Sequence, residues 1–415
     1  MFPEKIRLLN VSIGDADIAG QLIRASTYEF RYLQTDPAQA AVALLMPPAQ
    51  QLTWQDGDLF PPMDQNLPEG DLFMKIRELL PKQPMTPMHM LALVGRNGIG
   101  RLGYNLPDHT PTPMPRTLSK SELLGTAYTP EVFNELVAAY LSTGAGIAGM
   151  QPKIMVPDRP TVPIPSLIVK AASPAYPGLA ANEFLCLTAA RESGIETPTF
   201  ELSDDGQMLV LDRFDLVVHD NGRVERLGFE DIAALAGMRV RDILSDRKYQ
   251  GSYQRIAELL RQMQLPSDNL HRFFEQVAFS IMVRNGDAHL KNFGLLYRSA
   301  EDVWLAPMFD VVTTSIYTYT QYAGGPELED RTLALKLFAG KHHSKAYPTK
   351  EELEDFGRRV CGVSQPAHTL AHIAQAMHST MEKAKSDPRV PKALRALMAQ
   401  AWESGYGYAG MVFMP

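Results

Sequence analysis

One short segment of the sequence carries residues whose types and spacing suit phosphoryl transfer. Asp287 and Asn292 stand five positions apart in the run NGDAHLKNF, between apolar stretches over 273–283 and 293–297. A helix, a polar loop with D-x-x-x-x-N spacing and a strand form the layout of a kinase catalytic loop. There the aspartate accepts the proton of the acceptor hydroxyl, and the asparagine reaches a magnesium ion on the nucleotide phosphates. Taken alone, an Asn-Gly-Asp turn with a capping asparagine explains the segment equally well.

A second carboxylate follows in the order that a kinase-like site needs. Asp310 ends the run WLAPMFD, and we expect it at the end of a strand, facing the loop. The metal ion that bridges nucleotide phosphates takes hard oxygen ligands, so a carboxylate is required there. No glycine follows Asp310, so the segment is not a D-F-G motif, and a strand-end cap is the alternative.

A glycine-rich run lies upstream, at 144–149, and reads GAGIAG. We expect a helix before it and a strand after it, which is the wrong order for a Rossmann fold. The order suits a loop whose backbone N–H groups approach nucleotide phosphates, and a flexible connector is the alternative. The predicted phosphate-binding residues here are Gly144, Gly146, Ile147, Ala148, Gly149, Gln151 and Lys153.

Two further segments could complete a nucleotide site. Lys170 ends an apolar run that we predict to be a strand, and a lysine there can bind the α and β phosphates. Its expected partner is Glu183, on a helix predicted over 180–193 that Gly194 ends. The run at 209–215 links the two lobes. It provides either a hinge and an aromatic wall for adenine, with Asp212 and Phe214 as the residues concerned, or only an edge strand.

The elements that must position these residues fall into three predicted parts. Residues 1–115 form a small α+β module that ends in a proline-rich linker, residues 116–228 are strand-rich, and residues 229–415 are mostly helical. Asn-Gly and Asp-Gly turns predict hairpins at 90–100, 204–206 and 220–222. Predicted helices of the last part are 231–236, 253–264, 271–285, 350–360 and 367–385.

Composition narrows the class of protein. The chain has 415 residues, 45% hydrophobic and 21% charged, and a net charge of −7. This composition argues against disorder, and the acidic balance argues against nucleic-acid binding by this chain alone. No apolar run approaches the roughly 20 residues of a membrane-spanning helix. Cys186 and Cys361 are expected to be reduced core residues, so we expect a soluble, cytoplasmic, multi-domain enzyme.

Taken in order, the motifs resemble the HipA-type serine/threonine kinases, the toxins of bacterial type II toxin–antitoxin modules. The resemblance covers nearly the whole chain, and the catalytic-loop run is its most specific part. The matching segments are 28–33, 66–70, 93–96, 147–153, 168–170, 182–184, 212–215, 285–292 and 305–310.

The resemblance implies an α+β, two-lobed protein-kinase-like fold, with a β-rich N-lobe and a helical C-lobe, behind a small N-terminal α+β module. It implies ATP and Mg²⁺ as cofactors. Asp287 would be the catalytic aspartate, Asn292 and Asp310 the magnesium ligands, and Lys170 the phosphate-binding lysine. His289 is the second predicted catalytic residue, near the γ-phosphate, where many protein kinases carry a lysine.

The resemblance also implies partners. The expected substrate is a protein, an aminoacyl-tRNA synthetase, whose phosphorylation halts translation and leads to growth arrest and persistence. The expected inhibitor is a HipB-like helix-turn-helix antitoxin that makes most of the contact with operator DNA. No membrane contact is expected.

Two positions depart from the family pattern. Gly146 stands where family members often carry a serine whose autophosphorylation ejects the glycine loop, so this form of self-inactivation is not expected here. Asp212 replaces a glutamate that is frequent at the hinge. Two alternatives stay open: a small-molecule phosphotransferase, which shares the G-D-x-x-x-x-N loop, and a kinase-like regulatory subunit without turnover.

Overall fold

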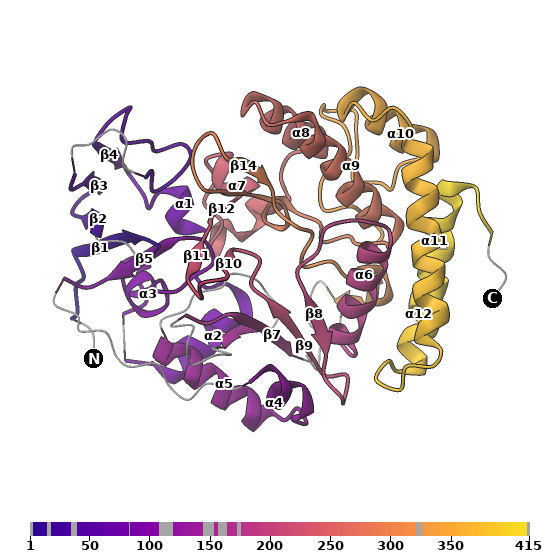
Figure 1. Cartoon of the computed structure of the whole chain (residues 1–415), viewed down its shortest axis with the longest axis horizontal. Coiled ribbons are helices and arrows are strands. Elements are labelled where there is room, and N and C mark those ends of the chain that lie inside the picture. Colours follow the sequence, from indigo (N-terminus) through magenta and orange to yellow (C-terminus); the bar gives the residue numbers. More distant parts are fainter. Residues whose placement is uncertain are drawn as a thin grey trace. The chain divides into compact units, whose positions relative to one another are not determined.

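The computed structural model describes residues 3–14, 18–34, 40–82, 84–107, 119–143, 153–156, 164–171, 176–320, 325 and 327–412. The chain divides into two compact units (Figure 1). The first combines Met1–Ala171, Val210–Arg247 and Gly294–Val303, and the second combines Ala172–Leu209, Lys248–Phe293 and Trp304–Pro415. The domain boundaries expected after residues 115 and 228 stay a prediction. Among the described helices, none is both long enough and apolar enough to cross a bilayer.

The N-terminal part of the first unit forms a five-stranded antiparallel sheet. Its strand order is β4-β3-β2-β1-β5 (Figure 1). In β3, Tyr28, Phe30 and Tyr32 are buried and alternate with more exposed residues, the pattern of a strand with one face on a core. The strands are β1 (Leu8–Ile13), β2 (Ile18–Arg24), β3 (Tyr28–Tyr32), β4 (Thr53–Asp56) and β5 (Leu102–Asn105), followed or interrupted by helices α1 (Pro61–Asp64), α2 (Gly70–Leu79), α3 (Pro87–Val94), α4 (Lys120–Gly125) and α5 (Pro130–Thr143).

The hairpin predicted at 90–100 is wrong, because its first half is helix α3. Thr86 caps this helix by accepting a hydrogen bond from the His89 backbone N–H, and Pro87 occupies the first turn. The run MLALV has no strict alternation, and a short apolar run of this kind does not distinguish a helix from a strand. The Asn-Gly pair instead lies in the loop that joins α3 to β5.

The rest of the first unit is built from short strands. β6 and β7 pair antiparallel with Lys153 opposite Lys170, and β12 pairs with β13. The predicted hairpin at 220–222 is confirmed, since β10 pairs with β11 and Gly222 has a φ of +79°. The remaining elements, of which β9, η1 and β14 run from one unit into the other, are β6 (Lys153–Val156), β7 (Leu167–Ala171), β9 (Met208–Asp212), β10 (Leu216–Val218), β11 (Val224–Arg226), β12 (Gly228–Asp231), α7 (Ile232–Leu235), η1 (Asp242–Tyr249), β13 (Gly294–Tyr297) and β14 (Val303–Leu305).

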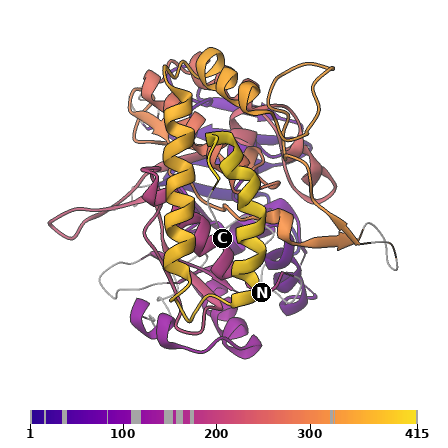
Figure 2. The same ribbon diagram turned by 90° about the vertical axis from the view of Figure 1, so that its right-hand side faces the viewer.

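Helices dominate the second unit. α11 packs against α6, α9 and α12, and α11 and α12 lie side by side in both views (Figures 1 and 2). The predicted helix at 180–193 is confirmed as α6, and Gly194 follows it with a φ of +86°. The longer elements are α6 (Leu179–Glu192), α8 (Tyr253–Gln262), α9 (Ser267–Met282), α10 (Lys350–Asp355), α11 (Pro366–Ala384) and α12 (Lys392–Tyr406), and the short ones are β8 (Phe200–Leu202), η2 (Leu290–Asn292), η3 (Thr314–Ile316), β15 (Thr318–Thr320), β16 (Glu327–Glu329), η4 (Phe356–Val360) and η5 (Gly407–Ala409).

A buried ion pair holds the loop after α3 within the first unit. The side chains of Arg213 and Asp215 are fully buried, with Nη2 and Oδ2 2.6 Å apart. Arg213 also donates to the backbone carbonyls of Asn97 and Gly98, at 2.9 and 2.8 Å. Asp215 accepts a hydrogen bond of 2.7 Å from the backbone N–H of Gly100. The pair therefore replaces its lost hydration with backbone groups of the loop between α3 and β5.

Arg226 completes this arrangement from β11. Its guanidinium donates to the carbonyl oxygens of Gly98, Gly100 and Leu102. The run at 212–215, predicted only as a hinge or an edge strand, thus has a second role: together with Arg226, it fixes the loop that leads into β5.

Asp215→Asn should strongly destabilise the protein, because it leaves the guanidinium of Arg213 buried without a carboxylate. We expect the free energy of unfolding to fall by about 3–5 kcal/mol, measured by urea denaturation. The control is Glu329→Gln, which breaks the ion pair with Arg331 on an exposed surface and should change stability by less than about 1 kcal/mol. Equal effects of the two substitutions would contradict a structural role for the buried pair.

Candidate active site

The loop that follows α9 is held by hydrogen bonds from its backbone N–H groups to side-chain oxygens. Arg284 adopts a left-handed φ of +59°, which is strained for a residue with a side chain. Asn285 Oδ1 accepts a hydrogen bond of 3.0 Å from the backbone N–H of Asp287, and the N–H of Gly286 donates to Thr314 Oγ1 at 2.7 Å. The position of Asp287 is therefore set before any ligand binds.

Gly286 is required by close packing. A Cβ atom at this position would overlap a carboxylate oxygen of Asp330 and lie 2.7 Å from the carbonyl oxygen of Thr332. The missing side chain thus lets the loop approach a third carboxylate, Asp330, which the sequence did not point to.

Opposing effects act on the pKa of the Asp287 carboxyl group. Burial raises its pKa above the ordinary value, and the nearby carboxylates of Asp310 and Asp330 raise it further. A hydrogen bond of 2.6 Å from the Tyr249 hydroxyl to Oδ1 and the positive charge of Lys248 act in the opposite direction. A carboxylate with a raised pKa that faces a hydroxyl group has the environment of a general base.

His289 lies beside this carboxylate and is almost fully buried. Burial is the main cause that holds its pKa well below the ordinary value, and the charges of Lys248 and Lys291 add to the effect. Its ring meets that of Tyr249 edge to face, with centroids 5.2 Å apart, and within the described structure its Nδ1 atom has no hydrogen-bond partner. His289 is therefore neutral near pH 7, unlike the lysine found at this position in many protein kinases.

Asn292 and Asp310 offer the oxygen atoms expected of a magnesium site. Asn292 Nδ2 lies 3.5 Å from the carbonyl oxygen of Asp310, and Asn292 Oδ1 accepts a hydrogen bond from the His289 backbone N–H. Asp310 has a left-handed φ of +52°. It was expected at a strand end, but β14 ends at Leu305, so Asp310 stands in the loop beyond it.

Asn292 and Asp310 do not complete the coordination of a metal ion by themselves. In the described parts of the chain, no three His, Cys, Asp or Glu residues come close enough together to hold a metal ion. An ion at Asn292 and Asp310 would therefore need phosphate oxygens or water as further ligands, which is the usual way in which proteins bind Mg²⁺.

The structure thus brings Asp287, His289, Asn292 and Asp310 together in the second unit. Glu183 is fully buried on α6 of the same unit, and Lys170 is buried on β7 of the first unit. The predicted glycine-loop residues Gly144, Gly146, Ile147, Ala148 and Gly149, together with Gln151, lie outside the described residues.

The two hinge candidates both belong to the first unit. Asp212 ends β9 with a half-exposed side chain, and its Oδ1 lies 3.3 Å from Lys120 Nζ. Phe214 packs edge to face on Phe229, with centroids 5.4 Å apart.

Sequence reasoning missed Lys248 and Tyr249 at the site. They precede Asp287 by 39 and 38 positions, at the end of η1, and no motif or spacing links them to the loop. Only the fold brings the Tyr249 hydroxyl to the carboxylate.

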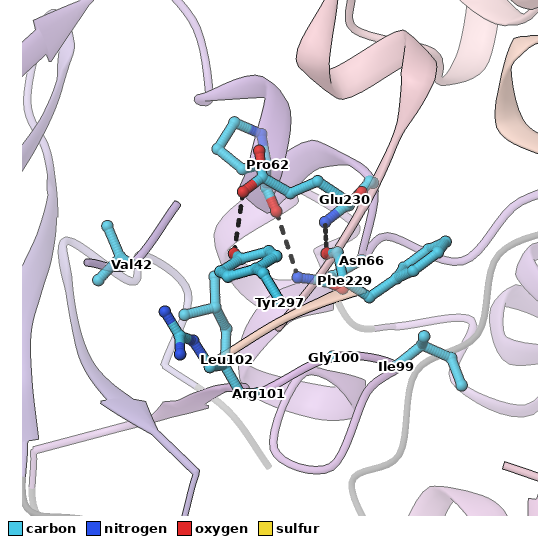
Figure 3. A pocket seen from close by; sticks show the side chains of 11 residues that line it. Val42, Pro62, Asn66, Ile99, Gly100, Arg101, Leu102, Phe229, Glu230 and Tyr297 are labelled. Atoms are coloured by element: carbon cyan, nitrogen blue, oxygen red, sulfur yellow. Dashed lines mark hydrogen bonds between the residues drawn. The ribbon is translucent and has the colours of Figure 1, made fainter. Parts of the chain in front are cut away.

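A small pocket in the first unit is a separate feature (Figure 3). Glu230 lines it and accepts hydrogen bonds from the Tyr297 hydroxyl, at 2.9 Å, and from the backbone N–H of Leu44, at 2.7 Å. Burial raises the pKa of Glu230 to about 7. None of the predicted catalytic, cofactor-binding or metal-binding residues lines this pocket, so the catalytic loop remains the candidate site.

Comparison with protein families agrees with the motifs. A model of the HipA-like C-terminal domain matches residues 145–385, and a model of the HipA N-terminal domain matches residues 9–105. The chain belongs to the HipA family. This confirms the resemblance on which the expectations for the site rest.

Curated relatives of this HipA-family chain carry the name of kinases. The putative kinase Y4dM of Sinorhizobium fredii is 32% identical over 167 residues, which are 37% of this chain and 38% of that protein. The putative kinase Y4mE of the same organism is 26% identical over 291 residues, 67% of this chain and 64% of that protein. The chain therefore spans less than two thirds of the length of these relatives.

One solved structure covers nearly the whole chain. HipA of Shewanella oneidensis MR-1, from a complex of HipA, HipB and operator DNA, has a TM-score of 0.70 at 17% identity. The match covers 97% of this chain and 96% of that one. At this identity the similarity concerns the fold alone, and the predicted kinase-like α+β fold class is confirmed.

Asp287→Asn should stabilise the fold. The pKa of Asp287 is raised in the folded state, so the ionised form of this side chain destabilises the fold. The destabilisation is absent below the ordinary carboxyl pKa of about 4 and grows as the pH rises. We expect a higher urea midpoint than wild type at about pH 8 and a smaller difference near pH 4. The control, Asp220→Asn in an exposed turn, should show no such gain. A lower midpoint for Asp287→Asn at about pH 8 would contradict the effect of burial.

Proposed function

We propose that this HipA-family chain is an ATP- and magnesium-dependent protein serine/threonine kinase. The observation that carries the proposal is the grouping of Asp287, Asn292 and Asp310 in the second unit. Asp310 raises the pKa of Asp287, so the two carboxylates lie close enough to repel each other. A cation between carboxylates relieves such repulsion, and a kinase site has a magnesium ion at this place.

Each residue has a role in the proposed transfer. Asp287 accepts the proton of the acceptor hydroxyl, while Asn292 and Asp310 hold magnesium, which neutralises charge on the phosphates when bound. Lys170 binds the α and β phosphates, and the glycine run at 144–149 covers them. Asp212 and Phe214 are proposed for the adenosine end, and the pairing expected between Glu183 and Lys170 stays a prediction.

The proposed biological role is that of a cytoplasmic toxin. The relatives named as putative kinases and the structural neighbour bound to HipB and operator DNA support a growth-arresting kinase that a HipB-like antitoxin inhibits. DNA contact would come mainly through that antitoxin, in keeping with the net charge of −7. We propose an aminoacyl-tRNA synthetase as the substrate.

Asp287→Ala should abolish phosphate transfer, because the general base and its charge are lost. With γ-labelled ATP and magnesium in a bacterial lysate, we expect the rate to fall at least about 100-fold, and phosphoproteomics should reveal one dominant synthetase. Asp220→Ala is the control and should keep the wild-type rate. Label on metabolites alone would favour a small-molecule phosphotransferase, and equal labelling by wild type and Asp287→Ala would exclude the proposed activity.

Asp310→Asn should raise the magnesium concentration needed for half-maximal transfer. The substitution removes a negative charge from the proposed ligand set, and ligand charge strongly affects the affinity of oxygen sites. A shift on the order of tenfold or more is expected in a magnesium titration of the rate, with Asp220→Asn as the unchanged control. An unshifted titration would rule out Asp310 as a ligand.

A further inference from the structure

Lys248 is a buried lysine whose charge is not balanced by an ion pair with any described residue. It lies at the end of η1 with 3% of its surface exposed. Within the part of the chain that the structure describes, it makes no ion pair and no hydrogen bond. Lysine is almost never fully buried unless it is paired, because removing an ammonium group from water is costly. An unpaired lysine at this depth therefore needs an explanation.

The surroundings of Lys248 connect it to the candidate active site. Its charge lowers the pKa of Asp287 and that of His289, so its ammonium lies within electrostatic range of both. The following residue, Tyr249, donates a hydrogen bond to Asp287, and Lys248 Nζ lies 5.3 Å from the centroid of the Tyr249 ring. All four residues belong to the second unit.

A second buried group at the same place also lacks a partner. Nδ1 of His289 is buried and makes no hydrogen bond within the described structure. A ligand with several acceptor atoms near Asp287 would engage both the Lys248 ammonium and the imidazole Nδ1 of His289. An anion fits this description, because the ammonium has donors only and the imidazole can donate through one nitrogen.

We propose that Lys248 is a further catalytic residue, whose ammonium contacts the phosphoryl group during its transfer. The assignment rests on the proposed kinase function. In the transition state, negative charge is spread over the equatorial oxygens of the transferred group. A fixed positive charge in a site of low dielectric stabilises this charge strongly. Lys248 thus supplies the charge that many kinases take from a lysine two positions after the catalytic aspartate, where this chain has His289.

In the proposed phosphoryl transfer, no covalent bond of Lys248 is made or broken. The acceptor oxygen forms a bond to the γ-phosphorus, the bond from that phosphorus to the bridging oxygen breaks, and ADP leaves with the electron pair. The acceptor proton passes to Asp287. Lys248 remains an ammonium throughout, and its contribution is electrostatic.

Lys248→Met tests the assignment, because methionine has a similar length and no charge. An interaction made only in the transition state affects kcat and leaves KM nearly unchanged. We expect kcat to fall at least about 100-fold, with KM for ATP within about threefold of wild type. Lys248→Arg should retain an intermediate rate. The control is Arg247→Met, which removes an exposed charge one residue earlier on η1 and should keep the wild-type rate.

Thermal unfolding separates catalysis from a structural role. Removing an unpaired buried charge should leave the Tm of ligand-free Lys248→Met equal to or above that of wild type. ADP with magnesium should raise the Tm of both proteins, and adding aluminium fluoride, a mimic of the transferred phosphoryl group, should raise it further only in wild type.

The outcomes distinguish this assignment from the proposed function. Wild-type kcat in Lys248→Met, an undiminished response to aluminium fluoride, or a lowered ligand-free Tm together with the lost rate would overturn the role of Lys248 and leave the kinase function in place. A wild-type protein that neither transfers phosphate nor responds to ADP would overturn both.

Discussion

Burying an ionised side chain removes its hydration, and the chain meets this constraint in two different ways. In the first unit, Arg213, Asp215 and Arg226 are surrounded by backbone groups of the loop at 97–102. Their charges are well compensated, so the loop and β5 are held firmly against strands that follow more than 100 residues later in the sequence. Compensation of this kind ties the loop at 97–102 to strands that belong to the same compact unit.

In the second unit, the charges of the buried side chains are only partly compensated. Burial raises the pKa of Asp287, and Lys248 is buried with no ion pair to any residue that the structure describes. Arg284 and Asp310 add left-handed backbone conformations on either side of the loop. Such strain persists only where the surrounding packing enforces it, and it concentrates at functional sites. Helix α9 contributes through its C-terminal end, where the backbone N–H groups of Arg284 and Asn285 donate to the carbonyl oxygens of Ile281 and Ser280.

The sequence revealed the parts of the site that are local in the chain. The spacing of Asp287 and Asn292 and the glycine after α6 depend on neighbouring residues, and the structure agrees with both. Helix α3 was missed because an apolar run of five residues does not determine its own conformation. Lys248 and Tyr249 could not be found, because their role depends on a contact across 38 or more positions that only tertiary packing creates. The partners of Arg213 were hidden for the same reason.

The mixture of charges around Asp287 also limits the ligand. Carboxylates come from Asp287, Asp310 and Asp330, and ammonium groups come from Lys248, Lys291 and Lys345. A bare anion would be repelled by the carboxylates, and a bare cation by the lysines. A ligand that carries both signs, such as a nucleotide phosphate with its magnesium ion, meets an opposite charge for each of its parts. The lowered pKa of His289 agrees with this argument, because a neutral imidazole adds no positive charge beside the lysines.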